Sequence, residues 1–172
     1  SARLVTQGKF ERTYGRVEAR IQIPRGQGIW PAFWMLGADI GAKGWPGCGE
    51  IDIMEVVGHE PNVLHGTAHW GAQGSTSSVS ATAIKTLSSG TFSDKFHVFS
   101  IIWENNRIRW YLDDVLYHTV TTANTGNANY PFNQEFFFIF NVAVGGDWPG
   151  NPDATTQFPQ KMLVDYVRVF QQ

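Results

Sequence analysis

The sequence predicts an all-β domain, an antiparallel sandwich of short strands. Three observations carry this prediction. Short segments in which apolar and polar side chains alternate recur along the whole chain. Segments rich in Gly, Pro, Asn and Asp separate them, as turns between strands do. No helical repeat of useful length interrupts the series, and 172 residues suffice for one domain with a substantial core.

The composition excludes several classes of protein and of site. A net charge of −2, a pI near 6.2 and the lack of any Lys/Arg run argue against a nucleic-acid surface. No apolar stretch of about 18 residues predicts a membrane span. The single cysteine, Cys48, excludes a disulfide within the chain and a CxxC metal pair, and is expected to be inert. Seven Trp exceed what one core needs, so some of them are expected to line a cleft for a neutral partner.

The first strands combine a core face with an aromatic face. Residues 1–23 alternate in blocks, of which Val17–Ile23 is the clearest strand. Residues 28–36, GIWPAFWML, form the next one, with Trp30 and Trp34 on the same face. An indole can stack on the C–H face of a sugar, so these two are candidate substrate platforms, with ordinary core packing as the alternative. The Gly- and Pro-rich segment that follows is expected to be a rim loop.

Residues 49–57, GEIDIMEVV, are the most informative part of the chain. Alternation places Glu50 and Asp52 on one face of a strand, but it would turn Glu55 toward the core, where an unpaired carboxylate is costly. One extra residue at Ile53–Met54, a β-bulge, would return Glu55 to the face of the other two acids. The sequence therefore predicts a bulged strand with three carboxyl groups on one face.

Three acids on one face suit acid/base chemistry. Their charges repel, so at least one should keep its proton to higher pH than a free carboxyl group does. The side chains of Glu50 and Glu55 could bring their carboxyl groups to about 5–5.5 Å, the separation in a retaining glycosidase, where one is nucleophile and the other acid/base. Asp52 lies between them, where it could hydrogen-bond to Glu50 and tune it. The alternative is an edge strand whose acids are simply solvated.

The next strand, Val63–Trp70, places His65 and His69 on one face. If it pairs with the acidic strand, His69 could reach Glu55 or a sugar hydroxyl. A metal shared by the two histidines would need a bend, because four strand steps span about 13 Å. Residues 71–93 are predicted to form a loop with a weak edge strand.

The middle of the chain predicts a hairpin ladder. Its strands are Phe96–Trp103, Arg107–Leu112 and Val115–Val120, with tight turns between them. The polar loop 121–132 carries three asparagines, which could offer carbonyl oxygens to calcium or, more commonly, support turns; they are Asn124, Asn127 and Asn129.

The C-terminal part predicts a central strand and a final one. Residues 135–144, EFFFIFNVAV, are apolar on both faces except at Asn141, which is expected to face the cleft. The loop after them offers Trp148 as another platform. The last strand, Lys161–Phe170, alternates and carries Asp165 among apolar neighbours, so a partner or a cation should compensate this acid.

Taken together, the chain resembles glycoside hydrolase family 16 and, within it, the laminarinase-like endo-β-1,3-glucanases. The resemblance spans nearly the whole chain in one order and rests on YGRVEARI (14–21), GIWPAFWML (28–36), GEIDIMEVVG (49–58), the pair His69-Trp70, NVAVGGDWPG (141–150) and MLVDYVRVFQ (162–171). It implies one catalytic domain over residues 1–172, a concanavalin-like jelly-roll sandwich of two curved antiparallel sheets with an open cleft.

The resemblance also implies roles for individual residues. Glu50 would be the nucleophile, Asp52 its assisting acid and Glu55 the acid/base. Substrate contacts are implied or expected at Trp30, Trp34, His69, Asn141 and Trp148. Asp165 matches a structural calcium ligand on the convex side, whereas catalysis itself needs no cofactor. A polysaccharide substrate and an extracellular, secreted location are expected.

Family members usually carry about seventy more residues before the point where this sequence starts. We therefore expect the N-terminal strands to come from a second chain or a swapped segment, or to have been cut away from this sequence, because exposed sheet edges would otherwise remain. A non-catalytic, lectin-like β-glucan-binding module is the alternative from another class. Within the family, the alternatives are mixed-linkage glucan as a further substrate, an agarase or a transglycosylase; a carrageenase would call for a basic cleft.

Overall fold

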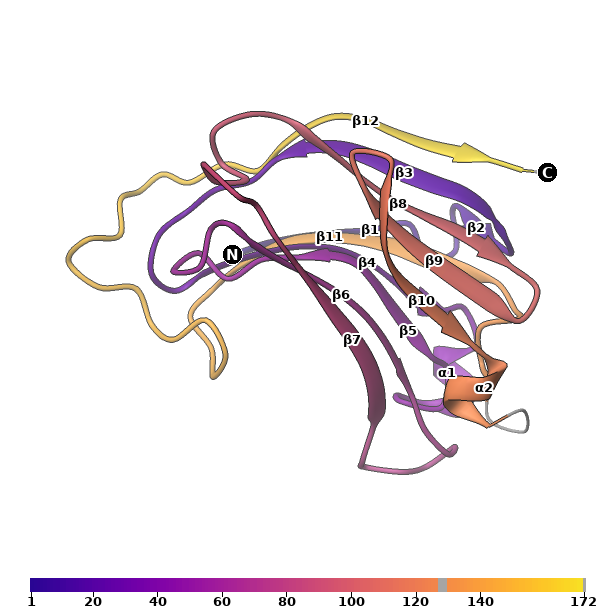
Figure 1. Cartoon of the computed structure of the whole chain (residues 1–172). Helices are drawn as coiled ribbons and strands as arrows, with labels where there is room; N and C mark the ends of the chain where they lie inside the picture. The colour runs from indigo at the N-terminus through magenta and orange to yellow at the C-terminus, as the bar shows by residue number, and fades with distance from the viewer. Residues whose placement is uncertain (127–129, 172) are drawn as a thin grey trace.

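The computed structural model of the chain describes residues 1–126 and 130–171. These residues form two antiparallel sheets packed face to face, which confirms the predicted all-β sandwich (Figure 1). Within them, one sheet has seven strands in the order β1-β11-β4-β5-β6-β7, with β2 beside β11, and the other has five in the order β10-β9-β8-β3-β12. Figure 1 shows the seven-stranded sheet curved, with its concave face turned away from the five-stranded sheet.

The strands of the seven-stranded sheet are β1 (Ala2–Val5), β2 (Glu11–Arg12), β4 (Ile29–Gly37), β5 (Glu50–Glu55), β6 (Val63–Trp70), β7 (Val79–Thr86) and β11 (Phe136–Val144). Those of the five-stranded sheet are β3 (Gly15–Gln22), β8 (His97–Glu104), β9 (Arg107–Leu112), β10 (Val115–Thr121) and β12 (Leu163–Phe170). The helices of the described residues are the single turns α1 (Ile40–Lys43) and α2 (Thr122–Thr125). Neither has the length or the apolar character that a membrane crossing requires.

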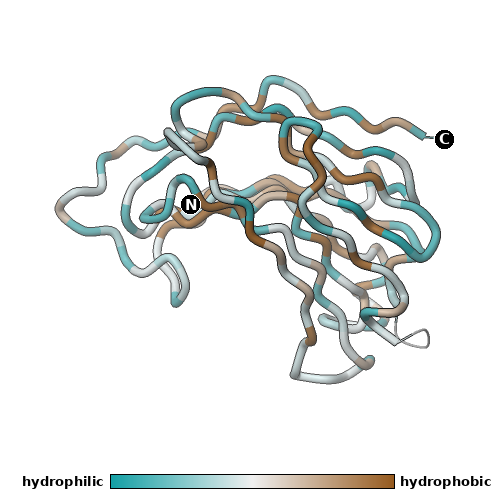
Figure 2. The backbone as a smooth tube through the Cα atoms, in the orientation of Figure 1, coloured by the Kyte–Doolittle hydropathy of each residue, from teal (hydrophilic) through white to brown (hydrophobic). Residues whose placement is uncertain are grey.

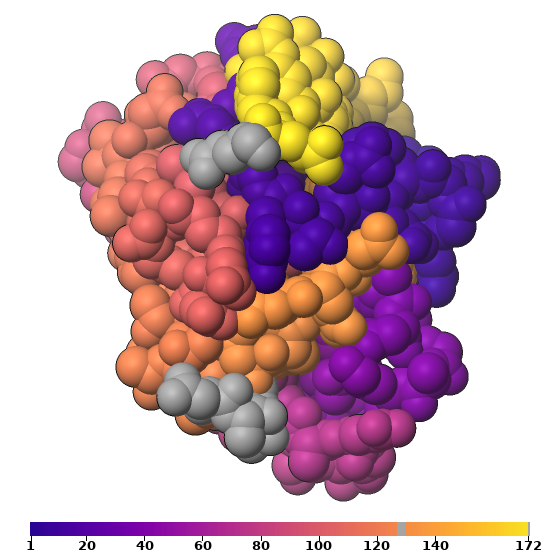
Figure 3. All heavy atoms as spheres, turned by 90° about the vertical axis from the view of Figure 1, so that its right-hand side faces the viewer, coloured from indigo at the N-terminus to yellow at the C-terminus, as the bar shows by residue number. Residues whose placement is uncertain are grey.

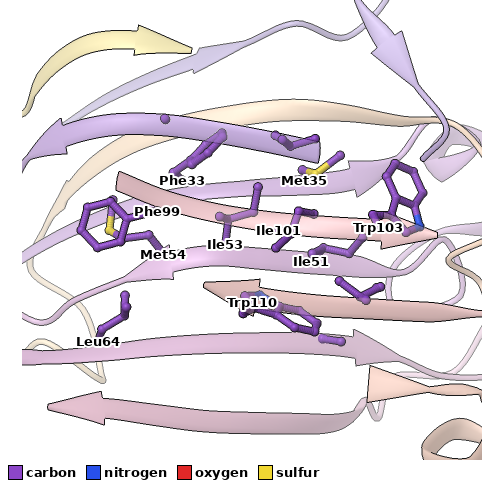
Figure 4. Close-up of a cluster of buried hydrophobic side chains, with 14 of the residues drawn as sticks. Phe33, Met35, Ile51, Ile53, Met54, Leu64, Phe99, Ile101, Trp103 and Trp110 are labelled. Atoms are coloured by element: carbon purple, nitrogen blue, oxygen red, sulfur yellow. The ribbon is translucent and has the colours of Figure 1, made fainter. Parts of the chain in front are cut away.

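The core lies between the two sheets and follows the period-2 patterns of the sequence. Ile51 and Ile53 of β5 are buried against β8, whose inward residues include Phe99 and Ile101 (Figure 4). Each large aliphatic or aromatic side chain buried in this way contributes roughly 1.5–3 kcal/mol. Figure 2 shows the hydrophobic residues concentrated along the strands and the hydrophilic ones along the loops that join them. The core therefore fixes which face of β5 is turned outward.

Tight turns join the strands of the hairpin ladder as expected. Asp113 and Asp114 have φ values of 46° and 64° between the paired residues Leu112 and Val115. Positive φ at both central residues is the requirement of a type I′ turn, whose twist matches that of the flanking strands, and Asp tolerates it better than most residues do. The prediction of successive hairpins is confirmed.

The polar loop after β10 contains the short helix α2. Asn124 accepts a hydrogen bond from the backbone N–H of Thr121 at 2.8 Å, so its side chain supports a turn, as the commoner alternative for this loop predicts. Asn127 and Asn129 lie outside the described residues.

Strand β12 departs from the expected alternation. A bulge at Asp165, between Val164 and Tyr166, shifts the register against β3. As a result Met162 and Val169, which stand on opposite faces in a regular strand, both pack against the core. The expectation that a partner or a cation compensates Asp165 is confirmed for the partner, because its half-exposed carboxylate pairs with Arg20 at 2.7 Å.

Glu18 lies on the face of β3 that points away from the core. It is nevertheless only 6% exposed, and its carboxylate accepts a hydrogen bond from Nε of Arg16 at 2.7 Å. Arg16 also pairs with Asp114 at 2.6 Å. The alternation was right, but the neighbouring side chains cover this acid.

The two edges nearest the chain ends are open. Strand β1 is exposed along its length, with Leu4 at 72%, and Phe170 of β12 is 50% exposed. Figure 3 shows the yellow C-terminal residues resting against indigo residues near the N-terminus, where Phe170 pairs with Arg16. The expected additional segment that would cover such edges stays a prediction.

Candidate active site

Strand β5 carries three carboxyl groups to one face through a bulge. Against β4, Asp52 pairs with Trp34 and Met54 with Phe33, which leaves Ile53 as the extra residue. The ladder to β6 is interrupted at the same place, between Asp52 and Glu55. The predicted bulge at Ile53–Met54 is confirmed. The acids also do not lie on an edge strand, because β5 is flanked by β4 and β6.

The three acids line a cleft on the outer face of the seven-stranded sheet. A cavity of about 450 Å³ lies over them on the β1 and β11 side, and a second of about 300 Å³ lies on the β6 and β7 side. The two cavities share Trp30, Glu50 and Glu55. Their further lining side chains include Arg3, Trp34, Asp52, Asn141, His65, Thr67, His69, Thr82 and Trp148. The arrangement suits an extended ligand that passes across the acids.

Burial raises the pKa of all three carboxyl groups, and the charges of neighbouring acids raise it further for Asp52 and Glu55. For Glu55, burial is the largest cause, followed by the charges of Asp52 and Glu50, and its pKa lies well above the usual value. The pKa of Asp52 is also raised well above its usual value by burial and by the charge and hydrogen bond of Glu50. Burial raises the pKa of Glu50 too, but His69, Trp45 and Asp52 oppose that change. The expectation that one acid keeps its proton is therefore confirmed in direction.

These pKa shifts indicate which of the three acids are protonated and which is ionised. A protonated Asp52 can donate a hydrogen bond to Glu50, because that bond raises the pKa of Asp52 and lowers that of Glu50. Glu50 is thereby favoured as the carboxylate. Glu55 is favoured as the carboxylic acid, since it faces two nearby acids in a buried place.

Two tryptophans donate directly to the glutamates. Nε1 of Trp30 donates to Oε1 of Glu55 at 3.1 Å, and Nε1 of Trp45 donates to Oε2 of Glu50 at 2.7 Å. The first indole was expected in the cleft as a platform. Trp45 was expected only in a rim loop, and its contact with Glu50 was missed, although its position five residues before that acid in a Gly- and Pro-rich segment is a usable signal.

The other expected substrate residues also lie in the cleft. Asn141 faces it from β11, where its Oδ1 accepts a hydrogen bond from Nε1 of Trp34 at 2.7 Å. The ring of Trp148 lies edge-on to Trp30 at 5.2 Å and to His65 at 5.0 Å. The structure therefore brings together Trp30, Trp34 and Trp148 as an aromatic wall beside the acids.

The two histidines of β6 take different places. His69 pairs with Glu50 across the ladder, and its Nε2 lies 3.2 Å from Oδ2 of Asp52, out of line for a hydrogen bond. It contacts Asp52 rather than Glu55. His65 pairs with Glu55 across the ladder and packs on Trp148. Among the described residues, His65 belongs to no group of three metal-ligating side chains, so the shared metal stays a prediction.

Two places bear on metal binding. Among the described residues, Glu50, Asp52 and His69 bring one ligand atom each within 4.8 Å of one another. An ion there would engage the same carboxylate that Asp52 and Trp45 already support. Asp165 belongs to no such group in the described part of the chain, and its carboxylate faces Arg20, so the side chains around it do not form a three-ligand site. The calcium expectation for Asp165 stays a prediction.

Comparison with known proteins agrees with this geometry. The model of the family described as "Glycosyl hydrolases family 16" matches residues 1–168. The laminarinase catalytic domain from Thermotoga maritima superposes with a TM-score of 0.91 at 48% identity, covering 100% of this chain and 69% of that one.

Two curated relatives show the range of activities among similar chains. The beta-glucanase of Rhodothermus marinus is 43% identical over 99% of this chain and 62% of its own length. The beta-1,3-glucan-binding protein of Penaeus monodon is 36% identical over 95% of this chain and 51% of its own length. The chain thus spans less than two thirds of the length of both relatives. Its jelly-roll fold, expected from the sequence, is confirmed by the superposition.

Proposed function

The chain belongs to glycosyl hydrolases family 16, and from that premise we propose that it hydrolyses β-1,3-glucan within the polymer and with retention of anomeric configuration. The observation that carries the proposal is the bulge of β5, which turns Glu55 into the cleft that also holds Glu50. The similarity to the T. maritima laminarinase and the R. marinus beta-glucanase supports glucan as the substrate.

The proposed reaction has two steps. In the first, Glu55 gives its proton to the glycosidic oxygen while a carboxylate oxygen of Glu50 attacks the anomeric carbon, so the bond to the leaving sugar breaks as the glycosyl–enzyme bond forms. In the second, ionised Glu55 takes a proton from water, whose oxygen attacks the same carbon and releases Glu50. Each step inverts the configuration of the anomeric carbon, so the two steps together retain it.

The surrounding groups support these roles. Protonated Asp52 and the indole of Trp45 both donate to Glu50, which favours its ionised form before attack. Burial beside two acids holds the proton on Glu55. The open, aromatic-lined cleft suits a long neutral polymer that passes across several strands, and the chemistry needs no cofactor. A polymer of this size is met outside the cell, so we propose an extracellular place of action.

The first test is hydrolysis of laminarin, with new reducing ends as the readout. Glu50→Gln and Glu55→Gln should each lower kcat by about 10³-fold or more while the melting curve stays cooperative. Near-normal turnover by either variant would remove that residue from its role. Binding of laminarin by the unaltered protein without any new reducing ends would instead support a binding module, the class to which the P. monodon relative's name points.

Azide separates the roles of the two glutamates. With an aryl β-laminaribioside, Glu50→Ala in azide should yield the α-glycosyl azide, because azide replaces the nucleophile in a single inversion. Glu55→Ala should yield the β-glycosyl azide, because Glu50 still forms the intermediate and azide then enters from the opposite face. Proton NMR of the products identifies the anomers, and an exchange of the two outcomes would reverse the assignment.

A further inference from the structure

The bulge that places Glu55 is tied to the opposite sheet by one buried hydrogen bond. Nε1 of Trp110, in the middle of β9, donates to the backbone carbonyl of Asp52 at 2.8 Å. Asp52 is the last residue of β5 that pairs with β6 before the bulge interrupts the ladder. A buried carbonyl at such a break is costly unless a donor reaches it, and here the donor comes from across the core.

A glycine makes room for this contact. Gly66 of β6 lies between Thr67, which pairs with Asp52, and His65, which pairs with Glu55, so it stands opposite the bulge. A Cβ at this position would collide with the Tyr117 hydroxyl and lie 2.9 Å from Cδ1 of Trp110. The missing side chain therefore lets the N–H edge of the indole approach β5.

The indole itself is held in place. Trp110 is fully buried, and the ring of His118 lies 4.7 Å from it at an interplanar angle of 36°. His118 in turn bonds through Nε2 to the carbonyl of Ala81 on β7 at 3.1 Å. Figure 4 shows Trp110 among the buried side chains of the core. The donor thus comes from a fixed group.

We propose that Trp110 is a positioning residue for the acid/base glutamate: its N–H fixes the carbonyl of Asp52, and thereby the bulge that directs Glu55 into the cleft. A bulge can shift along a strand by one residue, and a shift here would turn Glu55 away from Glu50. The bond across the core selects one register. The inference rests on the function proposed above.

The test replaces the indole without removing the aromatic ring. Trp110→Phe should lower kcat on laminarin by about 10- to 100-fold and leave KM within about twofold, because the catalytic geometry changes while the aromatic wall of the cleft does not. Trp103→Phe is the matched control. Trp103 is equally buried and also donates to a backbone carbonyl, that of Phe132 at 2.7 Å, but it does not contact β5 through this bond. The kcat of the Trp103→Phe variant should stay within about threefold of that of the unaltered protein.

Benzothienylalanine at position 110 provides a second variant in case Trp110→Phe does not fold. It replaces the N–H by sulfur at nearly constant shape, and it should lower kcat in the same way, while the same residue at position 103 should not. Equal kcat at both positions would overturn the proposal for Trp110, and so would a loss confined to KM. A lack of turnover by the unaltered protein would overturn the proposed function instead, so the two failures are distinguishable.

Discussion

The two glutamates of β5 differ in what donates to them, and that difference sets their roles. In the described part of the chain, Glu50 accepts a hydrogen bond from the indole of Trp45 and can accept another from protonated Asp52, whereas Glu55 accepts one from the indole of Trp30. A hydrogen bond to a carboxylate favours its charged form and lowers its pKa. The nucleophile therefore has more support for its charge than the acid/base has.

Trp30→Phe should shift the alkaline limb of the activity profile to higher pH. The indole N–H lowers the pKa of Glu55, so its loss raises that pKa further, and the protonated form needed for the first step persists to higher pH. The measurement is kcat/KM on laminarin across the alkaline range.

Trp34→Phe is the control for this shift. Its indole also faces the cleft but donates to Asn141, a neutral group, so the alkaline limb should stay in place even if KM rises. An equal shift in both variants, or a shift of the Trp30 variant to lower pH, would contradict the assignment of the alkaline limb to Glu55.

At this scale the sequence predicts side chains that belong to regular strands better than those that reach in from loops. Alternation and one bulge were enough to place Glu50, Asp52 and Glu55 on a common face, and Trp30 and Trp34 beside them. Trp45 was missed because its approach to Glu50 depends on the path of the loop around α1, for which the sequence has no repeating pattern. The burial of Glu18 was not predicted, because it comes from neighbouring side chains rather than from its own strand.

Among the elements, the strands of the hairpin ladder and of the sheet centre were predicted to within one or two residues. Val63–Trp70 coincides with β6, and Arg107–Leu112 with β9. Strand β12 was only half right, since the bulge at Asp165 reverses the faces of all residues after it. The bulge in β5 was predictable because a regular strand would bury a charge, whereas the apolar neighbours of Asp165 led us to expect a compensating partner or cation rather than a bulge.

Strand β3 carries an ion pair between Arg16 and the nearly buried Glu18. Arg16→Met would leave the carboxylate of Glu18, among the described residues, with Arg168 alone, at 3.9 Å, and should destabilise the fold by about 2–4 kcal/mol. Urea unfolding measures this loss. Hydrolysis well below the melting temperature should not change, because β3 belongs to the sheet that lies away from the cleft.

Two variants control this prediction. The double variant Arg16→Met/Glu18→Leu should recover most of the loss, because no buried charge then remains unpaired. Arg107→Met breaks the more exposed pair with Glu104 and should cost about 1 kcal/mol or less. A loss at Arg16 no larger than that at Arg107 would show that the burial of Glu18 does not matter.

In the molecule as a whole, the core between the sheets stabilises the fold, and the acids of the cleft destabilise it. The five-stranded sheet and the inner face of the seven-stranded one supply the buried apolar surface. The outer face of the seven-stranded sheet carries three acids whose ionised forms are disfavoured by burial. Such groups lower the free energy of unfolding wherever they are charged, which is a cost that active sites commonly carry.

The sign of this effect follows from the raised pKa of Glu55. In the unfolded chain this group titrates near 4.5, so between that pH and its higher pKa in the fold the native state holds more protons than the unfolded state does. The contribution of Glu55 to the free energy of unfolding therefore falls as pH rises through this window. Below the window both states are protonated and the contribution no longer changes.

Glu55→Gln should consequently make the protein more stable at pH 8 while it abolishes activity. The amide cannot ionise, and its oxygen can still accept the hydrogen bond of Trp30, so the variant loses the charge without losing the contact. The melting temperature should rise by about 2–4 °C for each kcal/mol of penalty removed. Because the penalty requires ionised Glu55, the gain should shrink as pH falls and vanish below about pH 4.5.

Calorimetric scans from pH 4 to 8 measure this gain in melting temperature, with Glu135→Gln, an exposed position, as the control. A gain that is independent of pH, or a loss at pH 8, would show that the burial of Glu55 does not disfavour its charge.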